Sequence, residues 1–81
     1  MNNALEISDL VREVRQRLGL TQEQFASRLG VTFPTINRWE NGRSKPSPMA
    51  QQLLITTLKQ LGDDYQDLLV KYFPNNTPDK I

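Results

Sequence analysis

Amide, hydroxyl and basic side chains are concentrated between positions 22 and 45 of this sequence of 81 residues. The members of this group are Gln22, Thr32, Thr35, Asn37, Arg38, Asn41, Arg43, Ser44 and Lys45. Side chains of these types hydrogen-bond to phosphate oxygens, and an asparagine or arginine can also pair with adenine or guanine at a base edge. Held together on one surface, such residues can bind a nucleic acid through both its backbone and its bases.

The charge distribution is compatible with phosphate contact. The net charge is only +1, but residues 12–45 carry seven basic and three acidic side chains, whereas residues 59–81 carry three basic and four acidic ones. A local excess of positive charge is sufficient, because affinity depends on the charges that meet the backbone. Mixed charges can also simply solvate helix faces, so charge alone leaves both interpretations open.

Composition excludes several other classes of protein. Cysteine and histidine are both absent, so disulfides, thiol chemistry and zinc sites built from these residues are excluded, and we expect no metal and no cofactor. Serines and carboxylates occur without a recognisable base–nucleophile pair, and there is no glycine-rich phosphate loop. We therefore expect that the protein is not an enzyme. No apolar run approaches the roughly 20 residues of a membrane helix, and the first residues lack the blocks of a signal peptide. We therefore expect a cytoplasmic protein without a membrane association.

Apolar residues recur at helical spacing in five segments, and no segment alternates like a strand. The predicted helices span about residues 4–18, 22–29, 33–40, 48–61 and 64–72. The predicted N-caps are Asn3, Thr21, Thr32 and Ser47, and Gly19, Gly30, Gly42 and Gly62 lie at or just beyond the ends of the first four helices. The sequence thus predicts a compact all-α domain of five helices over residues 1–73, followed by a disordered tail at 74–81.

The helical spacing also predicts which side chains are buried. The inner faces are predicted to consist of Ile7, Leu10, Val11, Val14, Leu18, Phe25, Ala26, Leu29, Ile36, Trp39, Met49, Leu53, Leu54, Leu58 and Leu61. Trp39 could instead serve as a stacking platform for a base. Its position three residues after Ile36 favours the core.

The second and third predicted helices have the spacing of a helix-turn-helix. Ala26 is small enough for the two helices to cross closely, Gly30 allows a sharp turn, and Val31 fills the notch between them. Ile36 and Trp39 then pack back onto the first two helices. In a helix-turn-helix the second of the two helices lies in the major groove of DNA.

On these residues the chain resembles the phage-repressor type of helix-turn-helix domain, known as Cro-like or XRE and lambda-repressor-like in fold. The matching segments are 20–23, Ala26, 29–32, 35–36, 38–42 and 45–46. The resemblance covers about residues 10–61. It implies a compact five-helix domain that binds double-stranded operator DNA, usually as a two-fold homodimer.

The resemblance also implies roles for individual residues. Base-reading positions are those of Phe33, Pro34, Asn37 and Arg38. Phosphate-contacting positions are those of Gln22, Thr32, Thr35, Asn41, Arg43, Ser44 and Lys45. In relatives an arginine at the position of Arg15 pairs with the glutamate at the position of Glu40, which fixes the recognition helix.

The chain departs from the family at the start of the third helix. Many relatives carry Gln, Ser or Arg where this chain has Phe33 and Pro34, and neither of these side chains can hydrogen-bond to a base. Phe33 can contact thymine methyl groups, take part in a protein contact or shield the edge of the core.

Two functions are consistent with these features. The first is a sequence-specific transcriptional regulator, a repressor or activator, with the helix at about 33–40 in the major groove. The alternative is a DNA-binding antitoxin or adaptor subunit that works through a protein partner bound at the last helix. The candidate apolar residues for that partner are Tyr65, Leu68, Leu69, Tyr72 and Phe73. A domain of this size can need some of them for its own core, and the remainder can form either a dimer seam or a docking face.

Overall fold

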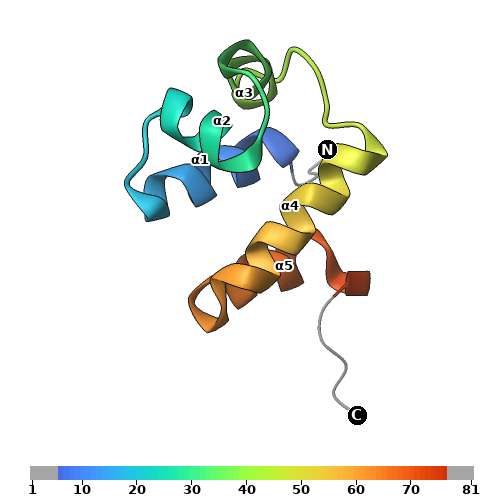
Figure 1. Ribbon diagram of the computed structural model, residues 1–81. Helices are drawn as coiled ribbons and strands as arrows, with labels where there is room; N and C mark the ends of the chain where they lie inside the picture. The colour runs from blue at the N-terminus through green and yellow to red at the C-terminus, as the bar shows by residue number, and fades with distance from the viewer. Residues whose placement is uncertain (1–5, 77–81) are drawn as a thin grey trace.

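A computed structural model describes residues 6–76 of the chain, and these residues form an all-α domain (Figure 1). Its five α-helices are α1 (Ile7–Leu18), α2 (Gln22–Leu29), α3 (Phe33–Glu40), α4 (Pro48–Leu61) and α5 (Gln66–Tyr72). Two short 3-10 turns, η1 (Asp63–Tyr65) and η2 (Pro74–Asn76), flank α5. The predicted fold class is therefore confirmed. None of the helices in residues 6–76 is long and apolar enough to cross a membrane.

Local capping sets the limits of the middle helices. The Thr21 hydroxyl accepts the Gln24 N–H at 3.1 Å, and the Gln24 side-chain oxygen accepts the Thr21 N–H at 2.9 Å, which completes a capping box at the start of α2. The hydroxyls of Thr32 and Ser47 likewise accept the backbone N–H three residues ahead and so cap α3 and α4. Gly30 ends α2 with φ +80°, a left-handed conformation that favours glycine. The three predicted N-caps at 21, 32 and 47 are thus confirmed.

The first and the last helix, α1 and α5, begin later in the chain than the sequence pattern predicts. Glu6 is extended (φ −96°, ψ 131°), and its carbonyl accepts the first hydrogen bonds of α1, so the helix begins at Ile7 rather than at residue 4. The predicted cap Asn3 lies outside the described residues. At the other end, Gly62 redirects the chain (φ +91°, ψ −158°) into η1, so α5 begins at Gln66 rather than at residue 64.

The predicted tail also differs at its start. Residues 74–76 form η2, which contacts α5, because Phe73 just before it is anchored in the core at 8% exposure. Residues 77–81 of the predicted tail lie outside the described residues.

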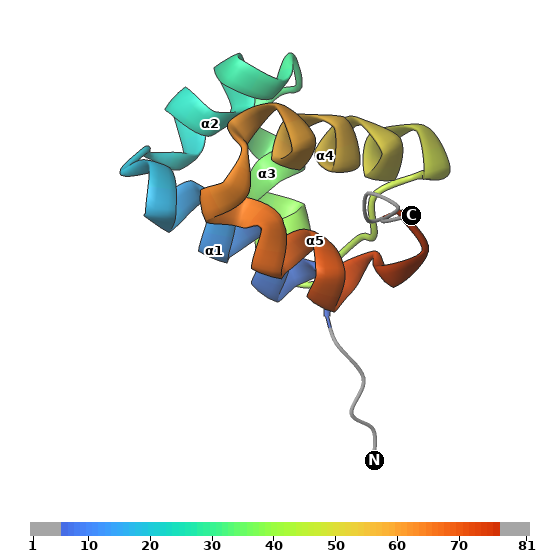
Figure 2. The same cartoon turned by 90° about the horizontal axis from the view of Figure 1, so that it is seen from below.

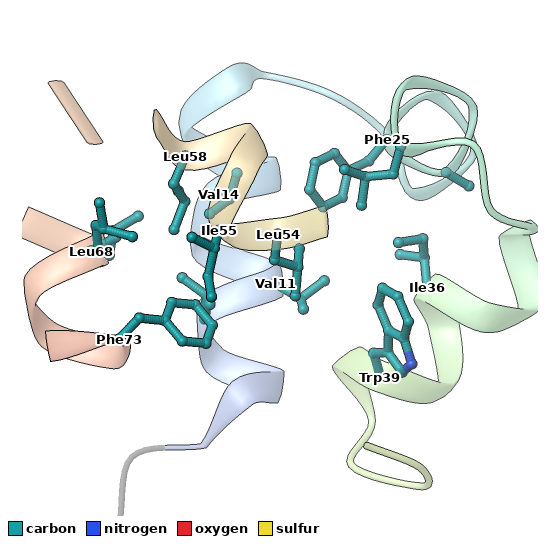
Figure 3. Close-up of a cluster of buried hydrophobic side chains, with 14 residues drawn as sticks. Val11, Val14, Phe25, Ile36, Trp39, Leu54, Ile55, Leu58, Leu68 and Phe73 are labelled. Atoms are coloured by element: carbon teal, nitrogen blue, oxygen red, sulfur yellow. The ribbon is translucent and has the colours of Figure 1, made fainter. Parts of the chain in front are cut away.

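The helices form two groups that share one core. α3 packs against both α1 and α2, while α4 pairs with α5, and α5 also contacts α1 (Figures 1 and 2). Side chains from all five helices meet between the groups (Figure 3). The labelled members of this cluster are Val11, Val14, Phe25, Ile36, Trp39, Leu54, Ile55, Leu58, Leu68 and Phe73. The core position predicted for Trp39 is confirmed at 5% exposure.

The predicted inner face of α4 is wrong at one position and incomplete at another. Met49 is 84% exposed, whereas Ile55, which the sequence pattern omitted, is 5% exposed. The buried face of α4 runs through Leu54, Ile55 and Leu58, and Met49 in the first turn lies off that face. The helix contacts α5 and α2.

The last helix does not offer the free apolar face expected for a protein partner. Leu68, Leu69 and Phe73 are 3%, 1% and 8% exposed because they fill the domain's own core. Tyr65 and Tyr72 are half-buried against the same core. The prediction that Leu68, Leu69 and Phe73 are available to a protein partner is therefore wrong.

Candidate nucleic-acid interface

A buried carboxylate at the end of α3 is the centre of the polar structure. The Glu40 side chain is 3% exposed, and the structure brings it against Arg15 of α1. Arg15 donates from Nε to Glu40 Oε2 at 2.6 Å and from Nη2 to Oε1 at 3.1 Å. Its remaining Nη1 donates to the carbonyl of Leu20 at 3.0 Å. This two-point contact fixes the distance and the orientation between α1 and α3.

Two further groups bind Glu40. Gln22, the first residue of α2, donates its amide to Glu40 Oε1 at 3.1 Å, and Arg12 donates Nη2 to the Glu40 carbonyl at 2.6 Å. Burial by itself raises the pKa of Glu40, but the hydrogen bonds from Arg15 and Gln22 outweigh burial, so its pKa lies below the ordinary value. The carboxylate bond in turn raises the pKa of Arg15. Both groups are therefore charged at neutral pH.

Arg12 was not among the site residues predicted from the sequence. The spacing in the sequence could have identified it, because Arg12 lies three residues before Arg15 and both guanidinium groups therefore share one face of α1. Its side chain is 41% exposed and also reaches Asp9 at 3.4 Å.

A chain of amides continues from Glu40 along α3. Asn37 donates Nδ2 to Gln22 Oε1 at 3.1 Å, and its own Oδ1 accepts Nδ2 of Asn41 at 3.1 Å. Asn37 is half-buried. The side chain expected to read bases thus holds α3 against α2 in this structure.

The hydroxyl groups at the start of α3 also have partners. The Thr32 and Thr35 hydroxyls are 2.8 Å apart and share a hydrogen bond, and Thr32 also caps the Thr35 N–H at 3.3 Å. Both hydroxyls are therefore used within the first turn of the helix.

Other predicted site residues on α3 and the loop after it are exposed and make no side-chain hydrogen bond or ion pair within residues 6–76. They are Phe33, Pro34, Arg38, Arg43, Ser44 and Lys45. The only acidic residue in residues 33–47 is Glu40, which is buried and paired with Arg15. The surface formed by α3 and residues 41–45, which we call the α3 face, is consequently basic and carries no exposed carboxylate. Among the described residues, no three carboxylates come together that could hold a metal ion.

Comparison with known proteins agrees with this geometry. Residues 11–61 match the family model described as helix-turn-helix. An uncharacterised HTH-type transcriptional regulator of Methanothermobacter thermautotrophicus is 58% identical over 38 residues, which cover 47% of this chain and 55% of that protein. A propionyl-CoA carboxylase regulator of Cereibacter sphaeroides is 36% identical over 58 residues, which cover 72% of this chain and 12% of that protein.

A further relative carries a different activity in its name. A type II methyltransferase of Lactococcus lactis subsp. cremoris is 41% identical over 51 residues, which cover 59% of this chain and 13% of that protein. The chain thus matches about half of the Methanothermobacter regulator and a small part of the other two relatives. No solved structure matches the chain.

We expect Glu40→Gln to lower the free energy of unfolding by about 3 kcal/mol. The substitution leaves the Arg15 charge without its counterion, and the cost lies at the low end of that for a broken buried pair because Arg15 keeps 19% exposure. Urea denaturation near neutral pH measures the loss. The matched control is Glu13→Gln, which removes an exposed partner of Arg17 and costs below about 1 kcal/mol. Equal losses in the two variants would contradict a central role for Glu40.

The same pair predicts a dependence of stability on pH. Because the pKa of Glu40 is below its ordinary value of 4.5, its stabilisation is complete above that pH and is lost as the pH falls through the folded-state pKa. The stability difference between the wild type and Glu40→Gln should therefore shrink on acidification below pH 4.5. Urea titrations of both proteins over a series of pH values measure the difference. A constant difference across the series would show that the ionised carboxylate contributes nothing.

Proposed function

The chain belongs to the helix-turn-helix family, in its XRE or Cro-like branch, and we propose that it regulates transcription by binding double-stranded DNA. The protein recognises a specific DNA sequence, and α3 lies in the major groove. The observation that carries the proposal is the α3 face, on which Arg38, Arg43 and Lys45 are exposed and unpaired while Glu40 is buried. Such a face meets an array of phosphates without a repelling carboxylate.

The loop after α3 supplies the phosphate contacts in this proposal. Arg43, Ser44 and Lys45 are exposed and have no competing partner within residues 6–76. Gln22 and Thr32 border the same face, and Thr35 and Asn41 belong to it. Each is hydrogen-bonded within the domain and contacts the DNA backbone through the donor or acceptor sites that those bonds leave free. Arg38 lies on α3 itself, and its free guanidinium is suited to the O6 and N7 of guanine.

Asn37 has a positioning role in this proposal. Its amide is bonded to Gln22 and to Asn41, so it holds α3 at the angle at which Arg38 is presented. A base contact by Asn37 would require one of these bonds to break or its second N–H to reach the groove.

The protein acts as a two-fold homodimer, at least on DNA, and the first half of α4 is the surface that suits a second copy. Met49 is 84% exposed, and beside it lies an open apolar groove of about 670 Å³ lined by residues that include Val31, Ala50 and Leu53. No charged residue lines this groove, so two copies can meet there without repulsion. The two α3 helices of such a dimer would address half-sites about 34 Å apart.

We expect Arg38→Ala and Lys45→Ala to weaken DNA binding in different ways. A preferred site is first selected from a random duplex library, and affinity for it and for scrambled DNA is then measured across a salt series. Arg38→Ala should lose roughly 1–3 kcal/mol of binding free energy and relax the preference at one base pair. Lys45→Ala should weaken binding to all sequences alike and reduce the slope of log affinity against log salt concentration by about one.

Lys59→Ala, in the last turn of α4, is the control that removes one cation outside the α3 face. If Arg38→Ala left both affinity and preference unchanged, the assignment of α3 as the reading helix would be wrong. If the wild-type protein bound scrambled and selected DNA equally, sequence-specific regulation would be excluded.

We expect Met49→Asp to dissociate the dimer without unfolding the domain. The side chain is exposed, and an aspartate in the first turn of a helix is favourable, so the change adds like charges only where two copies meet. Sedimentation velocity with and without the selected DNA measures the assembly. Val70→Asp alters another exposed apolar residue, on α5, and should leave the dimer intact. The opposite outcome for the two variants would place the dimer surface on α5.

A further inference from the structure

Two apolar side chains stand at the start of the helix that faces DNA. Phe33 and Pro34 occupy the first two positions of α3, and Phe33 is 44% exposed although it is one of the largest side chains in the domain. Neither is a member of the buried core cluster. The Phe33 ring therefore presents much of its surface to solvent on the α3 face.

The polar side chains around these two residues already take part in hydrogen bonds within the domain. The hydroxyls of Thr32 and Thr35 bond to each other, and the Asn37 amide bonds to Gln22 and Asn41. Pro34 has no backbone N–H. Within α3, the exposed side chains that make no hydrogen bond or ion pair in residues 6–76 are thus Phe33, Pro34 and Arg38.

The major groove offers one kind of apolar group. Thymine presents a C5-methyl group there, while the other unmodified bases present hydrogen-bond donors and acceptors. A cytosine methylated at C5 presents the same methyl group at the same ring position. Apolar side chains that cannot hydrogen-bond therefore select for this methyl group and against an unmethylated cytosine.

The neighbouring charges favour DNA over a protein as the occupant of this site. Pro34 and Arg38 are four residues apart on α3 and so lie next to each other on its surface. Arg43 and Lys45 follow in the adjoining loop, and Glu40 is the only carboxylate in this segment and is buried. An apolar contact bordered by free cations matches a base step inside a phosphate-lined groove.

Building on the proposed DNA-binding function, we propose that Phe33 and Pro34 recognise the C5-methyl group of a pyrimidine, in thymine or in 5-methylcytosine, beside the base contact of Arg38. Sequence preference at the start of α3 then depends on a methyl group rather than on hydrogen bonds. The two sources of the methyl group differ only in the base that carries it.

The test begins with the site selected from a random duplex library, and each thymine in it is replaced in turn by uracil. This replacement removes only the methyl group. We expect wild-type affinity to fall about fourfold at one or two positions, the factor expected for one buried methylene-sized group. With Phe33→Ala, affinity for the thymine site should fall by at least as much, and the difference between thymine and uracil should disappear.

Arg38→Ala is the matched control. It should bind more weakly but keep the ratio between thymine and uracil, because it removes the neighbouring base contact and leaves the apolar pair in place. Circular dichroism of each variant monitors folding. Since Phe33 lies outside the core, its replacement should leave the helix content unchanged.

A second arm separates the two sources of the methyl group. The sensitive thymine·adenine pair is replaced by cytosine·guanine, with and without the C5-methyl group, and a second selection uses a library in which every cytosine is methylated. Tighter binding to the methylated pair supports methyl recognition. A methylated library that yields a tighter site than the unmethylated one identifies 5-methylcytosine as the preferred source, and the reverse identifies thymine.

The outcomes also distinguish this inference from the proposed function. Failure to bind any duplex would overturn both. Sequence-specific binding that responds neither to uracil nor to 5-methylcytosine, or that keeps its response in Phe33→Ala, would overturn the inference alone.

Discussion

The burial of the Glu40 carboxylate is the constraint on which the arrangement of the first three helices depends. A carboxylate at the C-terminal end of a helix opposes the helix dipole, and a buried charge is costly unless it is paired. Arg15 from α1 and Gln22 from α2 both bind it, so the one carboxylate is stable only where all three helices meet. The angle of α3 is therefore fixed by a polar contact in addition to the packing of Ile36 and Trp39 beneath it.

The same contact determines the character of the surface. Pairing with Arg15 removes the only carboxylate of the α3 segment from solvent, which leaves Arg38, Arg43 and Lys45 as its exposed charges. The amide chain through Gln22, Asn37 and Asn41 extends the brace but occupies hydrogen-bonding groups. A recognition helix that uses its amides for bracing has fewer left for bases.

The small size of the domain determines what remains apolar on its outside. A domain of this size has few apolar residues to spare, and α5 contributes Leu68 and Leu69 to the common core. The large hydrophobic side chains that are exposed among the described residues are then Phe33 on α3, Met49 on α4 and Val70 on α5. The first two lie where the proposed contacts with DNA and with a second copy are made.

The sequence by itself determined the parts of this protein that depend on neighbours along the chain. The first residues of α2, α3 and α4 agree with the prediction because Thr21, Thr32 and Ser47 cap the N–H groups three residues ahead. The family resemblance rests on a short continuous pattern, and the match over residues 11–61 agrees with it. Only the tertiary structure decided that Ile55 is buried and Met49 exposed, and that Asn37 is bound to Gln22. Those outcomes depend on how helices distant in the sequence cross, and helical periodicity gives the faces of a helix but not the partner that each face meets.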